Sequence, residues 1–158
     1  MSKFTHLDSN NQVNMVDVSA KKITSRLAIA SGKIFLKSAF SKAKRNVLLK
    51  GDLLSTTKLS GIMAAKKTSE LIPLCHQIPL SSVKIETVWN TKLKSLEVIA
   101  TVKTNAQTGV EMEALTAVSI SLLTVYDMCK AIAKDLEIGE IQLLSKSGGK
   151  SGNYEKKN

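Results

Sequence analysis

Hydrophobic and polar residues alternate in several segments of the chain, as they do in half-buried strands. The segments with this period cover residues 13–20, 23–36, 83–90, 96–104 and 138–146. A short turn around residues 91–95 joins the third and fourth of them, which favours a hairpin. The pattern therefore predicts a sheet in which at least two strands are adjacent in sequence.

Helical spacing of apolar positions marks two further segments. Residues 38–48 indicate a short helix, and residues 56–72 indicate a longer one that stops at Pro73. Asp52 precedes the longer segment and has the side chain of an N-cap, while Gly51 permits the turn before it. Lys50 would then lie near a helix start, either as a solvated loop lysine or as a contact for an anion.

The longest helical pattern covers residues 110–134 and follows the Thr-Gly pair at 108–109. From Ala114 to Ala133 it is almost entirely apolar, so we expect most of its circumference to be buried. Together the strands and helices predict an α+β fold, in which helices layer a sheet.

Length and composition favour one soluble domain over residues 1–158. Apolar residues make up 43% of the 158, which is enough for a core, and no repeat divides the chain. We expect residues 1–12 and 150–158 to be mobile. The start MSKFTHLDSN lacks the apolar core of a signal peptide, and the run ALTAVSISLLTVY is too short to span a bilayer. Two cysteines are too few for a disulfide framework. These features predict a cytoplasmic protein.

The net charge of +10 predicts an anionic partner. That partner could be nucleic acid, a membrane surface or a phosphorylated small molecule. Alternatively, the basic surface serves only solubility and has no specific partner. Aromatic residues are 4% of the chain, which argues against the stacking platforms of single-strand binders.

Two charges interrupt the long helix. Asp127 and Lys130 are three residues apart, and Glu113, Thr116 and Thr124 fall along the same stripe as Asp127. Buried charges are costly unless paired, so one interpretation is a structural ion pair. The other is a pocket wall in which Asp127 holds and tunes a partly desolvated Lys130, whose lowered pKa would let it move protons near neutral pH.

Acidic residues occupy the first turn of the same helix. Glu111 and Glu113 suit the positive end of the helix dipole, which is the commonest reason for acids there. They point about 200° apart at 100° per residue, so they cannot both face one pocket of a single chain. One of them could face a neighbouring subunit.

The stretch SGGKSG at 147–152 is not a phosphate-binding P-loop, because the first glycine and the following helix of that motif are missing. A basic glycine-rich loop can still wrap an anion with its backbone N–H groups, assisted by Lys146 and Lys150. No zinc-ligand spacing is present, so we expect no metal site. Cys75 and His76 should point to opposite faces, Cys75 as a small apolar residue and His76 as a core histidine or a donor to an anion.

Seven short motifs occur together in a fixed order. They are MVDVSAK (15–21), KGD (50–52), GIMAAKKT (61–68), LIPLCH (71–76), TGVEMEALTA (108–117), YDMCKA (126–131) and KSGGKSG (146–152). In this order and spacing, over nearly the whole chain, they closely resemble the cyclic pyranopterin monophosphate synthases, the C-protein family of molybdenum-cofactor biosynthesis.

The resemblance implies a lyase with a ferredoxin-like α+β fold. Its substrate would be (8S)-3′,8-cyclo-7,8-dihydroguanosine 5′-triphosphate, and its products cyclic pyranopterin monophosphate and pyrophosphate. It implies a homohexamer, a trimer of dimers, with active sites at subunit interfaces. No cofactor would be required, although a divalent cation can accompany the triphosphate.

The resemblance also implies a set of site residues. The catalytic residues would be Asp127, Lys130 and Lys50, with the two lysines as the acid–base pair. The substrate-binding residues would be Asp17, Arg26, Leu74, Cys75, His76, Glu111, Met112, Glu113 and Lys146. Among these, Arg26, His76 and Lys146 would hold the triphosphate, with the C-terminal tail closing over it. Gln77 departs from the family pattern, because some relatives carry proline after the histidine.

Two other function classes compete with this interpretation. A basic nucleic-acid-binding module would cluster Lys and Arg with aromatic residues, whereas here Glu111, Glu113 and Asp127 lie among the basic residues. An inactive interaction protein could keep the fold, but all the family site positions retain their side chains. Steep weakening of duplex binding with salt would identify the nucleic-acid binder.

Overall fold

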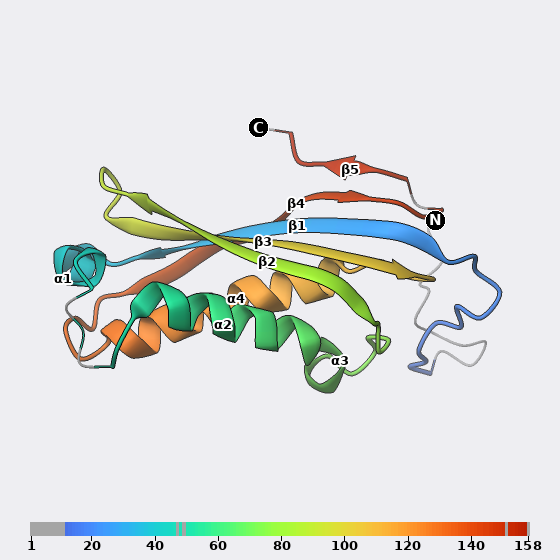
Figure 1. The fold of residues 1–158 in the computed structure, drawn as a ribbon, viewed down its shortest axis with the longest axis horizontal. Helices are drawn as coiled ribbons and strands as arrows, with labels where there is room; N and C mark the ends of the chain where they lie inside the picture. Colours follow the sequence, from blue (N-terminus) through green and yellow to red (C-terminus); the bar gives the residue numbers. More distant parts are fainter. Residues whose placement is uncertain (1–11, 47, 49, 151, 158) are drawn as a thin grey trace.

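A computed structural model of the protein describes residues 12–46, 48, 50–150 and 152–157. The expected mobility of the N-terminus falls on residues 1–11, outside the described part. The chain is elongated, with one sheet along its length and two long helices beneath it (Figure 1).

The sheet has five described strands, all antiparallel to their neighbours. They are β1 (Thr24–Phe35), β2 (Leu80–Asn90), β3 (Ser95–Ala106), β4 (Glu137–Ser147) and β5 (Tyr154–Glu155). Their order in space is β2-β3-β1-β4-β5. The hairpin predicted around residues 91–95 is confirmed, because β2 and β3 pair from Asn90 and Ser95 outward.

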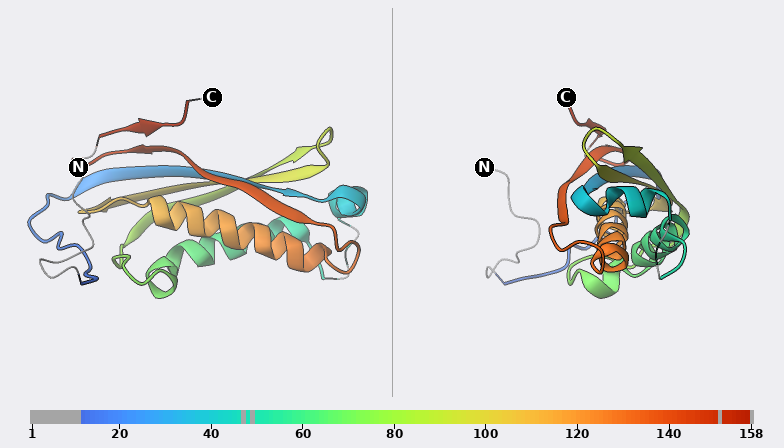
Figure 2. Two further views of the ribbon diagram at one scale, coloured as in Figure 1. Left: turned by 180° about the vertical axis from the view of Figure 1, so that it is seen from behind. Right: turned by 90° about the vertical axis from the view of Figure 1, so that its left-hand side faces the viewer.

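Five helical segments connect the strands. They are η1 (Lys37–Ala39), α1 (Phe40–Lys44), α2 (Leu53–Lys66), α3 (Thr68–Leu71) and α4 (Glu111–Cys129). Both α2 and α4 cover the same face of the sheet (Figure 2). Asp52 caps α2, as predicted, by accepting a 2.6 Å hydrogen bond from the Ser55 backbone N–H. The predicted long helix is confirmed, but it ends at Cys129 rather than at residue 134.

The connectivity matches the fold that the family resemblance implied. The order β1-α2-β2-β3-α4-β4 is a ferredoxin-like βαββαβ unit, and β1 and β3 occupy its centre. The α+β prediction is therefore confirmed. In the described residues, η1, α1 and the two-residue β5 are additions to this unit.

The core lies between the two central strands and α4. Alternate residues of β1, including Ala28, Ala30 and Ile34, are fully buried. Gly32 lies on the same face, and a Cβ atom there would stand 2.8 Å from side-chain carbons of Val118 and Leu122. The missing side chain therefore lets α4 approach the sheet closely.

Small residues bring α2 and α4 together. The Ser121 hydroxyl of α4 donates a 3.1 Å hydrogen bond to the Thr57 carbonyl of α2, and the Thr124 hydroxyl donates a 2.9 Å hydrogen bond to the Ser60 hydroxyl. A side chain on Gly61 would meet Ser121. These contacts hold the second half of α4 against α2, while Val118 and Leu122 pack on Gly32 of the sheet.

By length and composition α4 could cross a membrane. Half of its apolar window is buried inside the protein, where α4 packs on the sheet and against α2. The core helix of a soluble protein has these properties, which is how we interpret α4.

The strand predicted over residues 13–20 is wrong. Apart from a bridge at Val13, the structure has no strand there, and Val13 and Met15 are 72% and 47% exposed. The alternation arises because Val16 and Val18 line a cavity, while Asp17 turns outward to accept a hydrogen bond from the Ser19 backbone N–H. A cavity wall and a pleated sheet produce the same period of two.

The C-terminal tail contains a short strand that the sequence did not predict. Residues 154 and 155 form β5, which pairs with Ser145 and Lys146 at the edge of β4, whereas the predicted mobility of residues 150–158 stays a prediction. The tail therefore extends the sheet in the structure.

Candidate active site

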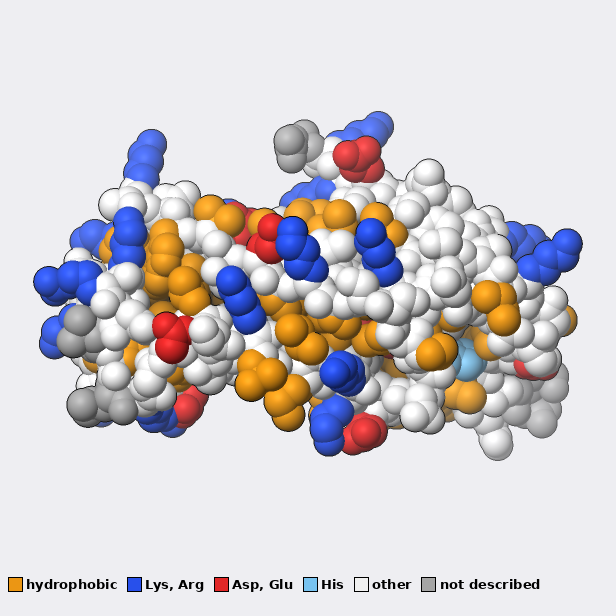
Figure 3. All heavy atoms as spheres, viewed as in Figure 1, with side chains coloured by type: hydrophobic (Ala, Val, Ile, Leu, Met, Phe, Trp, Pro, Cys, Tyr) orange, Lys and Arg blue, Asp and Glu red, His pale blue; other side chains and the backbone are white. Residues whose placement is uncertain are grey.

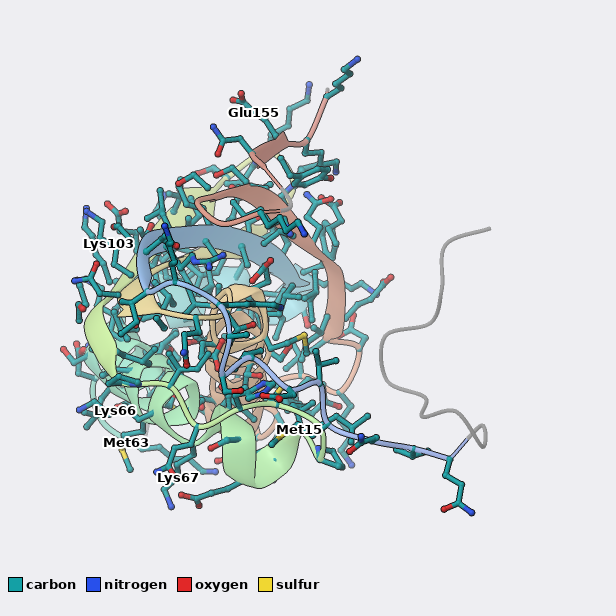
Figure 4. The ribbon with its side chains drawn as sticks, turned by 90° about the vertical axis from the view of Figure 1, so that its right-hand side faces the viewer. Met15, Met63, Lys66, Lys67, Lys103 and Glu155 are labelled. Carbon is teal, nitrogen blue, oxygen red and sulfur yellow. The ribbon has the colours of Figure 1, made fainter. Side chains whose placement is uncertain are left out.

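Residues 13–22 form an irregular segment, called the strap below, which crosses one end of the sheet (Figures 1 and 4; Met15 of the strap is labelled in Figure 4). Two side chains from elsewhere hold it. The Nε2 atom of His76 lies 2.7 Å from the Val16 carbonyl oxygen, and the Gln107 side-chain amide donates a 3.1 Å hydrogen bond to the Ser19 carbonyl. The strap therefore has fixed positions at residues 16 and 19.

The first cavity, of about 420 Å³, lies between the strap, the loop before β2 and the start of α4. Its lining is Val16, Val18, Lys21, Leu74, Cys75, His76, Ile78, Thr108, Gly109, Glu111, Met112 and Glu113. The predicted substrate-binding residues Leu74, Cys75, His76, Glu111, Met112 and Glu113 therefore meet in one place. The expectation that Glu111 and Glu113 cannot both face one pocket of a single chain is wrong, because both line this cavity. Cys75 and His76 both line this cavity, so the expectation that they serve opposite faces is wrong.

Glu113 is the buried acid of this cavity. Its side chain lies in the first turn of α4, and the residue is only 4% exposed. Burial raises the pKa of Glu113 to about 7, and the negative charge of Glu111 adds to the effect. Such a carboxyl group can hold or release a proton near neutral pH.

Cys75 has the opposite character from an activated nucleophile. Burial, and then the charge of Glu113, raise the pKa of its thiol. A protonated thiol is a weak nucleophile, so Cys75 serves this cavity as a small apolar surface.

The second cavity, of about 720 Å³, adjoins the first and is basic. It lies between the strap, the start of β1 and the end of β4. Its cationic lining residues are Lys21, Lys22, Arg26, Lys146 and Lys150. Four residues, Lys21, Thr108, Gly109 and Glu111, line both cavities. A ligand with an anionic end and a polar ring could therefore occupy the two together.

Arg26 is built into the wall of the basic cavity. It is 9% exposed, its Nη2 donates a 3.2 Å hydrogen bond to the Gln107 backbone carbonyl, and its Nε finds no hydrogen-bond partner among the described residues. Gly148 and Gly149 pack against it with φ values of +91° and +81°. Any Cβ atom at Gly149 would overlap the guanidinium, so the glycines of the SGGKSG stretch are needed to cover this arginine.

Lys146 and Glu111 connect the basic cavity to the helix. The Lys146 ammonium lies 2.8 Å from a Glu111 carboxylate oxygen, and both side chains are about a quarter exposed. Since Lys146 is in β4, it belongs to the rigid sheet and not to the tail. Glu111 therefore orients a cation at the mouth of the basic cavity.

A second polar group lies at the far end of α4. Asp127 pairs with Lys50 at 2.6 Å and with Lys130 at 2.7 Å, and Lys50 also donates to the Asp127 backbone carbonyl at 3.1 Å. All three residues are exposed. The Lys130 hydrogen bond, followed by the Lys50 one, lowers the pKa of Asp127 to about 2.

The expectation of a lowered pKa for Lys130 is wrong within this chain. Lys130 caps the exposed end of α4, so burial has little effect, and its hydrogen bond with Asp127 raises the pKa instead. The predicted pairing with Asp127 is present. The desolvation that would lower the pKa is not supplied by the described residues.

One chain does not bring the predicted site together. Glu113 and Asp127 are 14 residues apart on α4, which places them about 21 Å apart along the helix axis at 1.5 Å per residue. Glu111, Met112 and Glu113 of the first turn of α4 line the first cavity, whereas Asp127 of its last turn carries the cluster with Lys50 and Lys130. The start of α4 is the end nearest the strap, and its last turn is the end nearest α1 (Figure 1). Their shared stripe on the helix therefore does not form one pocket.

Asp17 has a local role in the strap. Its side chain turns back to the Ser19 amide, and this hydrogen bond lowers the pKa of the carboxyl group. Sequence reasoning missed two residues of the site, Lys21 and Gln107. Lys21 stands inside the MVDVSAK motif and could have been selected by position, whereas no local pattern pointed to Gln107. Within the described residues no group of three or more His, Cys, Asp or Glu side chains could hold a metal ion.

Known proteins resemble this chain over nearly all of its length. The sequence profile of the MoaC family matches residues 15–149. A protein of Trichodesmium erythraeum named cyclic pyranopterin monophosphate synthase is 55% identical over 151 residues, 95% of this chain and 91% of its own. Proteins of the same name from Nostoc sp. and Geobacillus sp. are 51% and 47% identical, covering 97% and 100% of this chain and 92% and 94% of their own.

Proposed function

The chain belongs to the MoaC family, and we propose that it catalyses the reaction for which its relatives are named, the formation of cyclic pyranopterin monophosphate. The substrate is the 3′,8-cyclised dihydro-GTP, and pyrophosphate is released. The observation that carries this conclusion is the identity of about 50% with synthases along nearly the whole chain. The reaction is a lyase step of molybdenum-cofactor biosynthesis.

The basic cavity suits the triphosphate. In the final step a ribose-derived hydroxyl attacks the α-phosphorus, the new P–O bond closes the cyclic phosphate, and the bond to the β-phosphate oxygen breaks. Negative charge moves onto the departing pyrophosphate. Arg26, Lys21 and Lys146 line the cavity where that charge would develop, and fixed cations stabilise it.

The first cavity suits the ring. Opening the guanine-derived ring and reclosing it as a pterin moves protons at several atoms. Glu113, with a pKa of about 7, faces this cavity and can exchange protons with a bound ring. His76 lines this cavity and not the basic one, so we assign it to a hydrogen bond with the ring rather than to the triphosphate. We retain Lys50 and Lys130 as the acid–base pair and Asp127 as the group that holds them.

Proton transfer requires these lysines to approach the substrate to about 3 Å. Since the cluster lies about 21 Å along α4 from Glu113, a second subunit must supply it. We propose that the cluster of one chain completes the cavities of another in a homohexamer, a trimer of dimers. Desolvation at such an interface would also favour a neutral, proton-accepting Lys130.

Exposed apolar side chains on the helical face are available for subunit contacts. Leu59 and Met63 of α2 and Leu123 of α4 are 59%, 52% and 54% exposed. Hydrophobic side chains gather over this face in Figure 3. Exposed groups of this kind mark interaction surfaces more often than isolated ones do.

Three further points belong to this proposal. No resident cofactor is required, a divalent cation can accompany the triphosphate, and the enzyme acts in the cytoplasm. Nothing in the comparisons favours the nucleic-acid-binding alternative, and the cations of the basic cavity share it with the acidic Glu111.

Turnover of the cyclised dihydro-GTP tests the function. Wild type should release pyrophosphate and pterin product one for one, and Lys130→Ala should release neither. Lys134→Ala is the matched control, because Lys134 is an exposed lysine shortly beyond the same helix. A wild-type hexamer, verified by light scattering, that forms no product would refute the proposed function.

A further inference from the structure

Gln107 joins two parts of the site that are far apart in sequence. It follows β3 directly and is half-buried. Its side-chain amide donates to the Ser19 carbonyl of the strap at 3.1 Å, and its own backbone carbonyl accepts the Arg26 guanidinium at 3.2 Å. One residue therefore contacts both the strap and the buried arginine of the basic cavity.

The contact at Ser19 controls how the strap meets the cavities. His76 fixes the strap at Val16, and Gln107 fixes it three residues later. Beyond this second point the strap supplies Lys21 and Lys22 to the basic cavity. Residues 20–22 make no strand or helix, but the Lys21 backbone N–H donates a 2.9 Å hydrogen bond to the Val18 carbonyl. Lys21 therefore belongs to a turn around Ser19, and the Gln107 contact at Ser19 positions this turn against the cavities.

We propose that Gln107 is a positioning residue for anion binding. Its side chain holds the strap so that Lys21 faces both cavities, and its carbonyl holds Arg26 beneath the anion. This inference rests on the proposed function, since it takes the anion to be the substrate's triphosphate and, after reaction, pyrophosphate.

The chemistry of the side chain makes the inference specific. Only a donor can satisfy the Ser19 carbonyl, and the glutamine amide supplies one without adding charge. Gln107→Met keeps the length of the side chain and removes the donor. Gln107→Glu keeps the shape, removes the donor and adds a negative charge beside the basic cavity.

Binding and turnover should separate in these variants. A net hydrogen bond of about 0.5–1.5 kcal/mol corresponds to a change of between about two-fold and about ten-fold. We expect Gln107→Met to raise both KM and the Kd for inorganic pyrophosphate by that factor while kcat changes less than about two-fold. Gln107→Glu should raise both further, because it repels the anion.

The experiment combines steady-state kinetics with calorimetric titration of pyrophosphate into the full-length protein. Gln142→Met is the matched control, since Gln142 is a glutamine of β4 that lines neither cavity. Hydrogen exchange of the wild-type strap with and without pyrophosphate is a second measurement that needs no variant. Pyrophosphate should slow exchange of the amides of residues 16–22.

The outcomes separate the two proposals. An unchanged KM and an unchanged Kd for pyrophosphate in both Gln107 variants would overturn the positioning role. So would hydrogen exchange of the strap amides that has the same rate with and without pyrophosphate. If the Gln107 variants lost kcat together with a lower melting temperature, that result would also overturn the positioning role, because it is what a purely structural role would produce. If the Gln107 variants bind pyrophosphate more weakly while the wild type shows no turnover, the positioning role would be supported and the proposed function refuted.

Discussion

Activity should be shared between subunits, and mixing two inactive variants tests this directly. Glu113→Gln disables the cavity end of α4, and Lys130→Ala disables the cluster at the other end. Within one chain these ends are about 21 Å apart along the helix, beyond the roughly 3 Å reach of proton transfer. If the cavity end and the cluster that surround one substrate come from different chains, some sites of a mixed oligomer combine the intact cavity end of one variant with the intact cluster of the other.

The expected recovery follows from counting. In a random one-to-one mixture each site receives an intact cavity end in half of the cases and an intact cluster in half, so about a quarter of wild-type activity should return. The variants would be co-expressed with different tags and purified through both tags in succession. Pyrophosphate release from the substrate would then be measured against each variant alone.

A second mixture provides the control. Wild type mixed with the double variant Glu113→Gln/Lys130→Ala should also give about a quarter of full activity if sites form between chains. If each site belonged to a single chain, this mixture would retain about half, and the mixture of single variants would show nothing above its components. That pair of results would refute the two-subunit site.

Three further predictions concern single residues. Burial raises the pKa of Glu113 from 4.5 to about 7, so ionisation of Glu113 destabilises the fold as pH rises through that range. Glu113→Gln should therefore add up to about 3 kcal/mol to the free energy of unfolding in urea at pH 8 and almost nothing at pH 4. A difference between variant and wild type that does not depend on pH would contradict this. Gly61→Ala should destabilise by about 1–3 kcal/mol in thermal or urea unfolding, because the methyl group would overlap the Ser121 hydroxyl, whereas a rise in stability would show that α2 can move away from α4. Since its pairing with Asp127 raises the pKa of Lys130, Asp127→Asn should lower that pKa. The rising limb of the rate profile, on which Lys130 loses its proton to act as a base, should then move to lower pH, and an unmoved limb would show that Lys130 does not titrate in the reaction.

Much of the fold follows from local patterns. The hairpin of β2 and β3, the N-cap at Asp52 and the buried α4 each depend on residues that are close in sequence, so the period and the capping chemistry were sufficient. The strap was missed for the same reason. Its alternation comes from one wall of a cavity formed by distant segments, and a strand of one sheet gives an identical pattern.

The charges of the site show the same limit. A pKa depends on burial and on partners brought from elsewhere, so the sequence could pair Asp127 with Lys130 but could not give the sign of the effect on Lys130. Lys50, 77 residues from Asp127, joins the cluster only because α2 packs against α4. Glu113 likewise lines a cavity whose other walls, the strap and the loop before β2, are distant from it in sequence, so its burial could not be predicted locally.

Two motifs that look like parts of one site in the sequence lie at opposite ends of α4 in the structure. A rigid helix carries TGVEMEALTA at one end and YDMCKA at the other, and core packing on both sides prevents it from bending the ends together. The same helix that separates the half-sites within a chain fixes each of them at an outer end, where a neighbouring chain can reach it. Rotation about a symmetry axis can then place the cluster of one subunit over the cavities of the next. In the proposed homohexamer such a chain would need its oligomer for catalysis, even though its cavities could bind the anion alone. Dilution below the dissociation range of that hexamer should therefore abolish turnover before it abolishes pyrophosphate binding.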